Sequence, residues 1–296
     1  MAEHTAADDH ARAAELAAAA GRLLLGVRDE AGFADARVLK DTGDLRSHEY
    51  LMAALAERCP GDAVLSEEGR ASAAGKRSRG DADRAPTGNT GDADRLAADR
   101  VWIVDPLDGT REFSEEGRPD WAVHVALWAK GDLAAGAVAL PARDVTLHTV
   151  AGGAAVSGPG AERSPLRVPD PAPGRLRIAV SRTRPPEFVR ALADVLDAEV
   201  ELVPIGSAGA KISAVLLGEV DAYVHAGGQY EWDSAAPAAV AVAAGAHASR
   251  VDGSPLVYNR PDPMLPDILV CHPLSASMLL TGIRDVRDAL PAERPR

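Results

Sequence analysis

Cysteine is scarce in this chain of 296 residues. Only Cys59 and Cys271 are present, and their separation fits neither a zinc-binding motif nor a disulfide framework. Long apolar runs are absent as well, because no run reaches the roughly 18 residues that a membrane-spanning helix requires. The N-terminus carries no charged-then-apolar segment followed by a cleavage site. We therefore expect a cytoplasmic protein without a membrane partner.

Positive charge is also in short supply. Lysine and arginine together number 32 against 44 aspartates and glutamates, which gives a formal net charge of −12. A protein that coats a nucleic acid polymer would carry a basic stripe, so no nucleic acid partner is expected. An acidic chain can still bind a small phosphorylated metabolite if bound cations reverse the local field. The apolar content of 46% suffices for a large core in one domain or two lobes.

The first hundred or so residues combine helical patterns with one polar stretch. Apolar residues recur at helical spacing over 11–30, and a second helix is predicted over 47–58. Residues 63–66 are typical of a short strand. Small and charged residues dominate 69–100, which cannot bury enough apolar surface to offset its ordering entropy. We therefore expect a flexible surface insertion over 69–100.

The rest of the chain alternates between strands and helices. Strands are predicted at 121–128, 133–140 and 145–150, and the Gly- and Pro-rich stretch 151–175 is interpreted as a hinge. Further elements are then predicted in this order: strand 176–180, helix 186–196, strand 200–203, helix 210–217, strand 221–224, helix 233–245, strand 268–271 and a terminal helix. The pattern predicts a mixed α/β fold with an N-terminal α+β lobe over 1–160 and a C-terminal α/β lobe over 161–296.

The most informative stretch is Asp105-Pro106-Leu107-Asp108-Gly109-Thr110. The apolar run 101–104 before it predicts a buried strand, and Pro106 and Gly109 predict a turn. Two acids at the mouth of a buried strand repel each other unless a cation lies between them. Ligands that are all oxygen atoms favour a hard ion, Mg²⁺ before Zn²⁺. The motif therefore predicts a magnesium site for phosphate chemistry.

Further acids stand at the ends of predicted elements. Glu67 and Glu68 follow the strand at 63–66, Asp233 opens a helix, and Asp44 precedes another helix. Taken singly, a glutamate pair after a strand is typical of a solvated turn, and an aspartate at a helix start is typical of an N-cap. Their joint occurrence with Asp105 and Asp108 is what favours a site.

A second interpretation begins from the Asp-x-Asp-x-Thr loop of aspartate-dependent phosphatases. In this chain Asp105 and Asp108 are separated by three positions rather than two, and no paired Asp-Asp metal motif lies downstream. The spacing therefore argues against a nucleophilic aspartate of that class.

The motif at 105–110, Glu67 and the segment Trp232-Asp233-Ser234-Ala235-Ala236 together resemble the inositol monophosphatase superfamily. Its members are Mg²⁺-dependent, lithium-sensitive phosphatases of sugars and nucleotides. The resemblance runs in family order from about residue 41 to residue 259 and is greatest for the bacterial 3′(2′),5′-bisphosphate nucleotidases of sulfate assimilation. It implies a layered α/β/α/β/α fold, an active site between two lobes, and a homodimer.

The resemblance also implies individual roles. Glu67 would bind one Mg²⁺ with Asp105 and the Leu107 carbonyl, and Asp105 would bridge to a second Mg²⁺ held by Asp108 and Asp233. Asp44 would act with Thr110 to orient and deprotonate the attacking water, so the implied catalytic residues are Asp44, Thr110 and Glu67. Substrate contacts are implied for a larger set: Glu67, Leu107, Asp108, Gly109, Thr110, Ser207, Lys211 and Asp233. The family's usual threonine-alanine lead-in to the catalytic aspartate is replaced here by Asp41-Thr42-Gly43.

The expected reaction is hydrolysis of the 3′-phosphate of adenosine 3′,5′-bisphosphate to AMP and phosphate. Inositol phosphatases place a glutamate seven residues before the helix-opening aspartate, and here that position is Ala226. Lys211 stands where the nucleotidases place a substrate lysine, whereas His225 stands where relatives often carry arginine. An arginine fork in the segment 181–184 could face a second phosphate. An inositol monophosphatase or fructose-1,6-bisphosphatase of relaxed specificity is the alternative within the class, and a non-catalytic sensor of phosphorylated metabolites is the alternative outside it.

Two expectations concern residues beyond these motifs. The insertion over 69–100 directly follows Glu67 and Glu68, so we expect it to modulate metal occupancy. His124 and His148 fall within predicted strands and are expected to have structural roles.

Overall fold

The computed structural model describes residues 6–69, 91–158, 162–182 and 187–289. Its helices are α1 (Ala6–Ala31), α2 (Ala36–Arg58), α4 (Asp92–Ala97), α5 (Thr110–Phe113), α6 (Glu187–Val195), α7 (Ala208–Leu216), α8 (Glu231–Ala243) and α9 (Pro273–Ala289), with a 3-10 turn at Pro141–Arg143. None of these helices combines the length and the apolar character needed to cross a membrane.

The first sheet has seven strands that pair in chain order. They are β1 (Ala63–Ser66), β2 (Arg100–Asp108), β3 (Ala122–Ala129), β4 (Asp132–Leu140), β5 (Val145–Val150), β6 (Gly153–Ser157) and β7 (Arg163–Leu166). Only the β1–β2 pair among them is parallel.

The second sheet has five strands in the order β11-β12-β10-β8-β9. They are β8 (Arg175–Ser181), β9 (Glu199–Ile205), β10 (Ala222–Tyr230), β11 (His247–Ser249) and β12 (Met264–Cys271). The strands β10, β8 and β9 run parallel, with β9 at the edge, and β12 pairs antiparallel with both β10 and β11.

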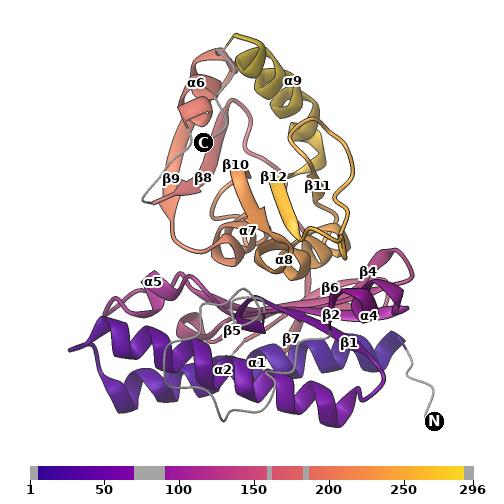
Figure 1. Cartoon of the computed structure of the whole chain (residues 1–296). Helices are drawn as coiled ribbons and strands as arrows, with labels where there is room; N and C mark the ends of the chain where they lie inside the picture. The colour runs from indigo at the N-terminus through magenta and orange to yellow at the C-terminus, as the bar shows by residue number, and fades with distance from the viewer. Residues whose placement is uncertain (1–5, 70–90, 159–161, 183–186, 290–296) are drawn as a thin grey trace.

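The elements stack in five layers, which confirms the layered α/β/α/β/α fold. Figure 1 shows α1 and α2 below the first sheet, α7 and α8 between the two sheets, and α6 and α9 beyond the second sheet. Both faces of the first sheet are covered, so β2 has a continuous apolar run at 101–104 rather than an alternating pattern. Val101 and Ile103 pack toward the middle layer, whereas Trp102 and Val104 pack toward α1 and α2.

Small residues bring α8 close to the first sheet. Gly136 on β4 is buried, and a Cβ added there would lie 2.7 Å from Ala239 Cβ and 2.9 Å from the Ala236 carbonyl oxygen. Alanines therefore dominate this helix because larger side chains would hold it away from the strands. This contact matters to the site because α8 carries Asp233 in its first turn.

The predicted helix at 47–58 begins earlier than expected. The helix α2 starts at Ala36, where the Asp35 side chain accepts the N–H groups of Arg37 and Val38 at 3.0 and 3.1 Å. Asp44 therefore lies within a helix and does not precede one. Gly43 is a packing requirement, because a Cβ there would lie 2.6 Å from Phe113 Cε1.

Two predicted loops contain regular structure. The proposed hinge at 151–175 holds β6 and β7, so the first sheet continues to Leu166 and the second begins at Arg175. The division into two lobes at residue 160 stays a prediction. Within the expected flexible insertion, residues 70–90 lie outside the described residues, but 92–97 form α4 and Arg95 is fully buried.

The sequence predicts a turn at Pro106 and Gly109, but the chain turns only at Gly109. Strand β2 continues through Pro106 to Asp108, with an irregular register against β3 between Asp105 and Asp108. Proline is tolerated at such an irregularity because no ladder hydrogen bond needs its missing N–H. Gly109 then has φ of 84°, the left-handed conformation that glycine adopts without strain.

The close contact at Gly136 generates a stability prediction. Gly136→Val should lower the free energy of unfolding by about 1–3 kcal/mol, because the new side chain forces α8 away from β4. Gly26→Ala is the matched control: it lies in α1 with no atom within 4 Å of an added Cβ, and it should stabilise by about 0.5–1 kcal/mol. Urea unfolding followed by circular dichroism measures both. Equal stability of the Gly136→Val variant and the unchanged chain would contradict the packing described.

Candidate active site

Three acids from two elements, two of them buried and one half-buried, converge at the boundary between the first sheet and the middle helices. Asp105 and Asp108 lie at the end of β2, and Asp233 lies in the first turn of α8. One carboxylate oxygen from each lies within 4.8 Å of the others. Asp105 is 1% exposed and Asp108 is 7% exposed. Like charges this close in an apolar setting can coexist only with protons or a cation between them.

Asp108 is the best stabilised of these acids. Its carboxylate accepts the N–H groups of Ala208 at 3.2 Å and Gly209 at 2.6 Å, which belong to the N-terminus of α7. Nε2 of the buried His124 lies 3.1 Å from its Oδ2. Burial raises the pKa of Asp108, but His124 and the Gly209 N–H outweigh it and hold that pKa below its usual range.

His124 is a site residue that the sequence reasoning missed, because we expected only a structural role for it. Its Nδ1 lies 2.9 Å from the Trp232 carbonyl oxygen, so the ring spans Asp108 and the start of α8. Burial lowers the pKa of His124, but the charge and hydrogen bond of Asp108 raise it by more. The net result is a pKa above the usual range. The register of β2 and β3 places His124 opposite Asp105, and this pairing is the signal that could have found it. His148 contacts Ser157 and the Thr149 carbonyl instead.

Asp105 and Glu67 both have raised pKa values. Burial first, and then the charges of Glu67 and Asp108, raises the pKa of Asp105 well above its usual range, although the Leu107 N–H at 3.0 Å partly opposes the shift. Burial and the charge of Asp233 raise the pKa of Glu67 to about 8. Glu67 directly follows β1, whose Ser66 pairs with Val104, so it lies alongside Asp105 without joining the tight group.

Asp233 is oriented by its own helix. Its Oδ2 accepts the Tyr230 N–H at 2.6 Å, which caps the start of α8. Burial and the charge of Asp108 raise the pKa of Asp233 to about 6. The side chain is therefore fixed with its carboxylate toward β2.

The structure brings Asp44 and Thr110 together from sequence positions far apart. Thr110 Oγ1 lies 3.4 Å from Asp44 Oδ1 and 3.2 Å from the Leu107 carbonyl oxygen, and it can donate to either. Burial and the charge of Glu68 raise the pKa of Asp44 to about 7. A carboxyl that titrates near neutrality beside a hydroxyl is suited to proton transfer.

The Gly109 turn fits closely against the other side of the site. A Cβ added to Gly109 would lie 2.8 Å from Ser207 Cβ, and one added to Gly209 would lie 2.0 Å from His124 Nε2. Any side chain at either glycine would therefore separate α7 from β2. The contact between Asp108 and the N-terminus of α7 depends on both positions.

Ser207 and Lys211 both lie at the start of α7 and are engaged with the protein itself. Ser207 is the N-cap of the helix and accepts the Ala210 N–H at 3.0 Å. Lys211 is buried, and its Nζ donates to the Gly206 carbonyl and lies 5.4 Å from the centre of the Tyr223 ring. Burial lowers the pKa of Lys211. Contact of either side chain with substrate stays a prediction.

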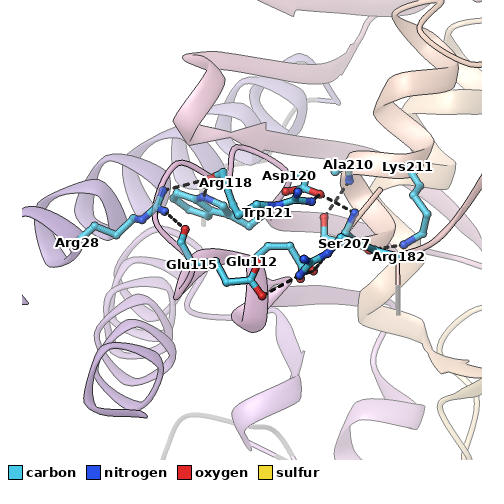
Figure 2. A network of polar contacts seen from close by, with 11 residues as sticks. Arg28, Glu112, Glu115, Arg118, Asp120, Trp121, Arg182, Ser207, Ala210 and Lys211 are labelled. Atoms are coloured by element: carbon cyan, nitrogen blue, oxygen red, sulfur yellow. Dashed lines mark hydrogen bonds and ion pairs between the residues drawn. The ribbon is translucent and has the colours of Figure 1, made fainter. Parts of the chain in front are cut away.

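A polar network joins the segment after Thr110 to the second sheet. Asp120 accepts the Gly206 N–H at 2.7 Å and an Arg118 guanidinium hydrogen, and its carbonyl accepts the Ser207 N–H at 3.1 Å. Arg182, at the end of β8, donates to Glu112 at 2.9 Å and to Glu115 at 2.8 Å. Figure 2 shows Arg182, Ser207 and Lys211 together at one end of this network, with Arg28 at the other. Glu112 belongs to the segment 107–113 that carries the family resemblance, whereas no sequence pattern singles out Asp120.

The residues at this site fit a divalent cation. The side chains of Glu67, Asp105, Asp108 and Asp233 offer only oxygen ligands, and the elevated pKa values of most of them reflect buried negative charge without compensation. Such a set matches a hard cation and not a soft one. The arrangement can therefore bind a metal at the point where Asp44 and Thr110 can exchange a proton.

Comparison with known proteins agrees with this geometry. The model of the inositol monophosphatase family matches residues 9–286. The chain is 49% identical over 94% of its length and 94% of the other chain to a 3′-phosphoadenosine 5′-phosphate phosphatase of Mycobacterium leprae. It is 49% identical, over 90% of each chain, to the protein of the same name from Mycobacterium tuberculosis.

Solved structures show the same architecture. CysQ from Bacteroides thetaiotaomicron, a bacterial member of the inositol monophosphatase family, has a TM-score of 0.73 at 26% identity over 90% of this chain and 97% of that chain. Mycobacterium tuberculosis SuhB has a TM-score of 0.68 at 26% identity over 94% of this chain and 96% of that chain. Because the family model spans nearly the whole sequence and the fold agrees, the chain belongs to the inositol monophosphatase family.

Proposed function

We propose that this chain hydrolyses the 3′-phosphate of adenosine 3′,5′-bisphosphate, giving AMP and phosphate, with Mg²⁺ as its cofactor. The observation that carries the phosphatase chemistry is the convergence of Asp105, Asp108 and Asp233, whose oxygens lie within 4.8 Å of one another. The choice of substrate is supported by the mycobacterial relatives, which are named for this reaction and are 49% identical over almost the full chain.

The proposed metal ligands divide into two groups. Glu67, Asp105 and the Leu107 carbonyl would hold one Mg²⁺, and Asp105, Asp108 and Asp233 would hold the other. When bound, the metal neutralises charge on the transferring phosphoryl group and acidifies a neighbouring water. His124 and the α7 N-terminus keep Asp108 ionised and fixed in place.

Thr110 and Asp44 handle the proton of the attacking water. The Thr110 hydroxyl can accept that proton while it passes its own to Asp44 Oδ1, 3.4 Å away. Asp44 has a pKa of about 7, so it can take up a proton and release it again near neutral pH. Gly109, without a side chain, lets backbone N–H groups approach the phosphate closely.

Two residues, one on β10 and one on α7, favour a nucleotide over inositol phosphate. Ala226 offers no carboxylate for a polyol hydroxyl. Lys211 lies at the start of α7, where it would be the cation nearest to a nucleotide phosphate, whereas Arg182 is already paired with Glu112 and Glu115. Fructose 1,6-bisphosphate is the second candidate because it shares two phosphate groups with the nucleotide. The cytoplasmic location and the homodimer stay predictions.

The reaction is tested by phosphate release from adenosine 3′,5′-bisphosphate, inositol 1-phosphate and fructose 1,6-bisphosphate with Mg²⁺, in the presence and absence of lithium. We expect the highest kcat/KM for the nucleotide and inhibition by lithium. The matched control is Asp105→Asn, which keeps the acceptor for the Leu107 N–H but loses the charge. The kcat/KM of this variant should fall more than ~100-fold. Loss of a residue that merely orients a metal ligand lowers activity by up to about a hundredfold, and loss of the ligand itself should lower it more.

Preference for inositol 1-phosphate would leave the metal mechanism intact and overturn the substrate. Tight Mg²⁺-dependent binding of the nucleotide without turnover would favour a sensor in place of an enzyme.

The raised carboxylate pKa values predict an unusual pH dependence of stability. The pKa of Glu67 rises from 4.5 to about 8 on folding. The metal-free folded chain thus binds more protons than the unfolded chain between these pH values, and its stability falls as pH rises through that window. Asp105→Asn removes one of the repelling charges and should weaken this fall. The difference in melting temperature between Asp105→Asn and the unchanged chain in EDTA should therefore grow from pH 5 to pH 8.

The comparison of the two chains isolates the effect of the Asp105 carboxylate, because every other titratable group is present in both. A difference in melting temperature that is constant over this range, or that shrinks, would contradict the repulsion among these acids.

A further inference from the structure

Arg95 is fully buried, although it lies in the stretch expected to be a flexible surface insertion. From α4 its Nη1 donates to Asn259 Oδ1 at 2.5 Å, and its Nη2 donates to the Arg260 carbonyl at 3.1 Å and to Asp92 at 3.0 Å. Burying a guanidinium is unfavourable unless most of its donors are satisfied; both terminal nitrogens of Arg95 have acceptors, whereas its Nε has none among the described residues. Only an arginine fork reaches these acceptors together. The contact therefore ties α4 to the loop before β12.

The loop before β12 is hydrogen-bonded to the first residue of α8. The N–H groups of Asn259 and Arg260 donate to Glu231 Oε2 and Oε1, each at 2.7 Å. Glu231 is 1% exposed and is the first residue of α8. Asn259 has φ of 59°, the left-handed conformation, which turns consecutive N–H groups toward one carboxylate.

Asp233 lies two residues after Glu231 in the same helical turn. Its carboxylate accepts the Tyr230 N–H, and the Glu231 N–H donates to the Pro263 carbonyl at 2.8 Å. The direction of the Asp233 side chain therefore depends on how this first turn is held. A continuous set of hydrogen bonds leads from Arg95 through the 259–260 loop and Glu231 to that turn.

We propose that Arg95 is a positioning residue for Asp233, which holds the first turn of α8 so that this carboxylate meets Asp105 and Asp108. The proposal rests on the metal-binding role of Asp233 given above. It assigns a function to α4, which belongs to the part of the 69–100 stretch that the structure describes: this helix positions the ligand that α8 contributes.

The experiment is titration calorimetry of the full chain with Mn²⁺, without substrate. Arg95→Lys keeps the charge but loses the fork, and it should raise the dissociation constant for Mn²⁺ about tenfold, the low end of the range for loss of a residue that supports a metal ligand. Asn259→Gly removes the side-chain acceptor while glycine keeps the left-handed backbone, so this variant should fold and shift the constant in the same direction.

Arg177→Lys is the matched control for the loss of stability that follows when an arginine with several hydrogen bonds is replaced. Arg177 donates to Asp221 and to the carbonyls of Gly218 and Glu219, near the start of β8 and β10 and thus at the opposite end of these strands from α8. We expect lower melting temperatures for Arg95→Lys and Arg177→Lys alike, but weaker Mn²⁺ binding only for Arg95→Lys. In turnover assays, Arg95→Lys should raise the metal concentration for half-maximal rate and leave KM for the phosphate ester unchanged at saturating metal.

Mn²⁺ binding by Arg95→Lys and Asn259→Gly that matches the unchanged chain would overturn the proposal. If Arg95→Lys does not fold, Asn259→Gly decides alone. Failure of the unchanged chain to bind Mn²⁺ would instead overturn the metal site itself, so the two failures are distinguishable.

Discussion

Repulsion among buried carboxylates is the constraint on which the rest of this structure depends. Asp105, Asp108 and Asp233 meet within 4.8 Å, and the charge of Glu67 reaches them. An apolar interior screens such charges poorly, so the folded chain is unfavourable here without protons or a cation. The cluster of acids lowers the stability of the metal-free chain. Local destabilisation of this kind is typical of a site for binding or catalysis.

Much of the surrounding architecture holds these acids in place. The N-terminus of α7 and His124 stabilise Asp108, and the start of α8 carries Asp233. Both helices lie in the middle layer, where they contact the first sheet and the second (Figure 1). Glycines at 109, 136 and 209 permit the close approach of helix and strand that this requires. The layered fold thus brings acids from the first sheet and from a middle-layer helix to one point.

Local sequence signals predicted a large part of this arrangement. The apolar run before Asp105, the bounds of β1 and β5, and the helix that carries Asp233 are evident from patterns within a few residues. The pairing of Asp44 with Thr110, 66 positions away, came from family resemblance and not from any local pattern.

The parts that were wrong or missed depend on tertiary contacts. The helix predicted from residue 47 begins at Ala36, with Gly43 packed against Phe113. Arg95 is predicted to lie on a polar surface but is buried against Asn259. His124 looked like an ordinary strand residue until its register placed it beside the acids. Partners distant in sequence decide each of these, and a single sequence contains no record of such pairs.

The most direct test of this account is the number of protons released when Mg²⁺ binds at pH 7, measured by titration calorimetry in buffers of different ionisation enthalpy. Because the pKa values of Glu67 and Asp105 are raised in the metal-free chain, binding should displace on the order of one proton per chain. Mg²⁺ binding with no proton release would mean that these carboxylates are already ionised without the metal, and it would contradict the account.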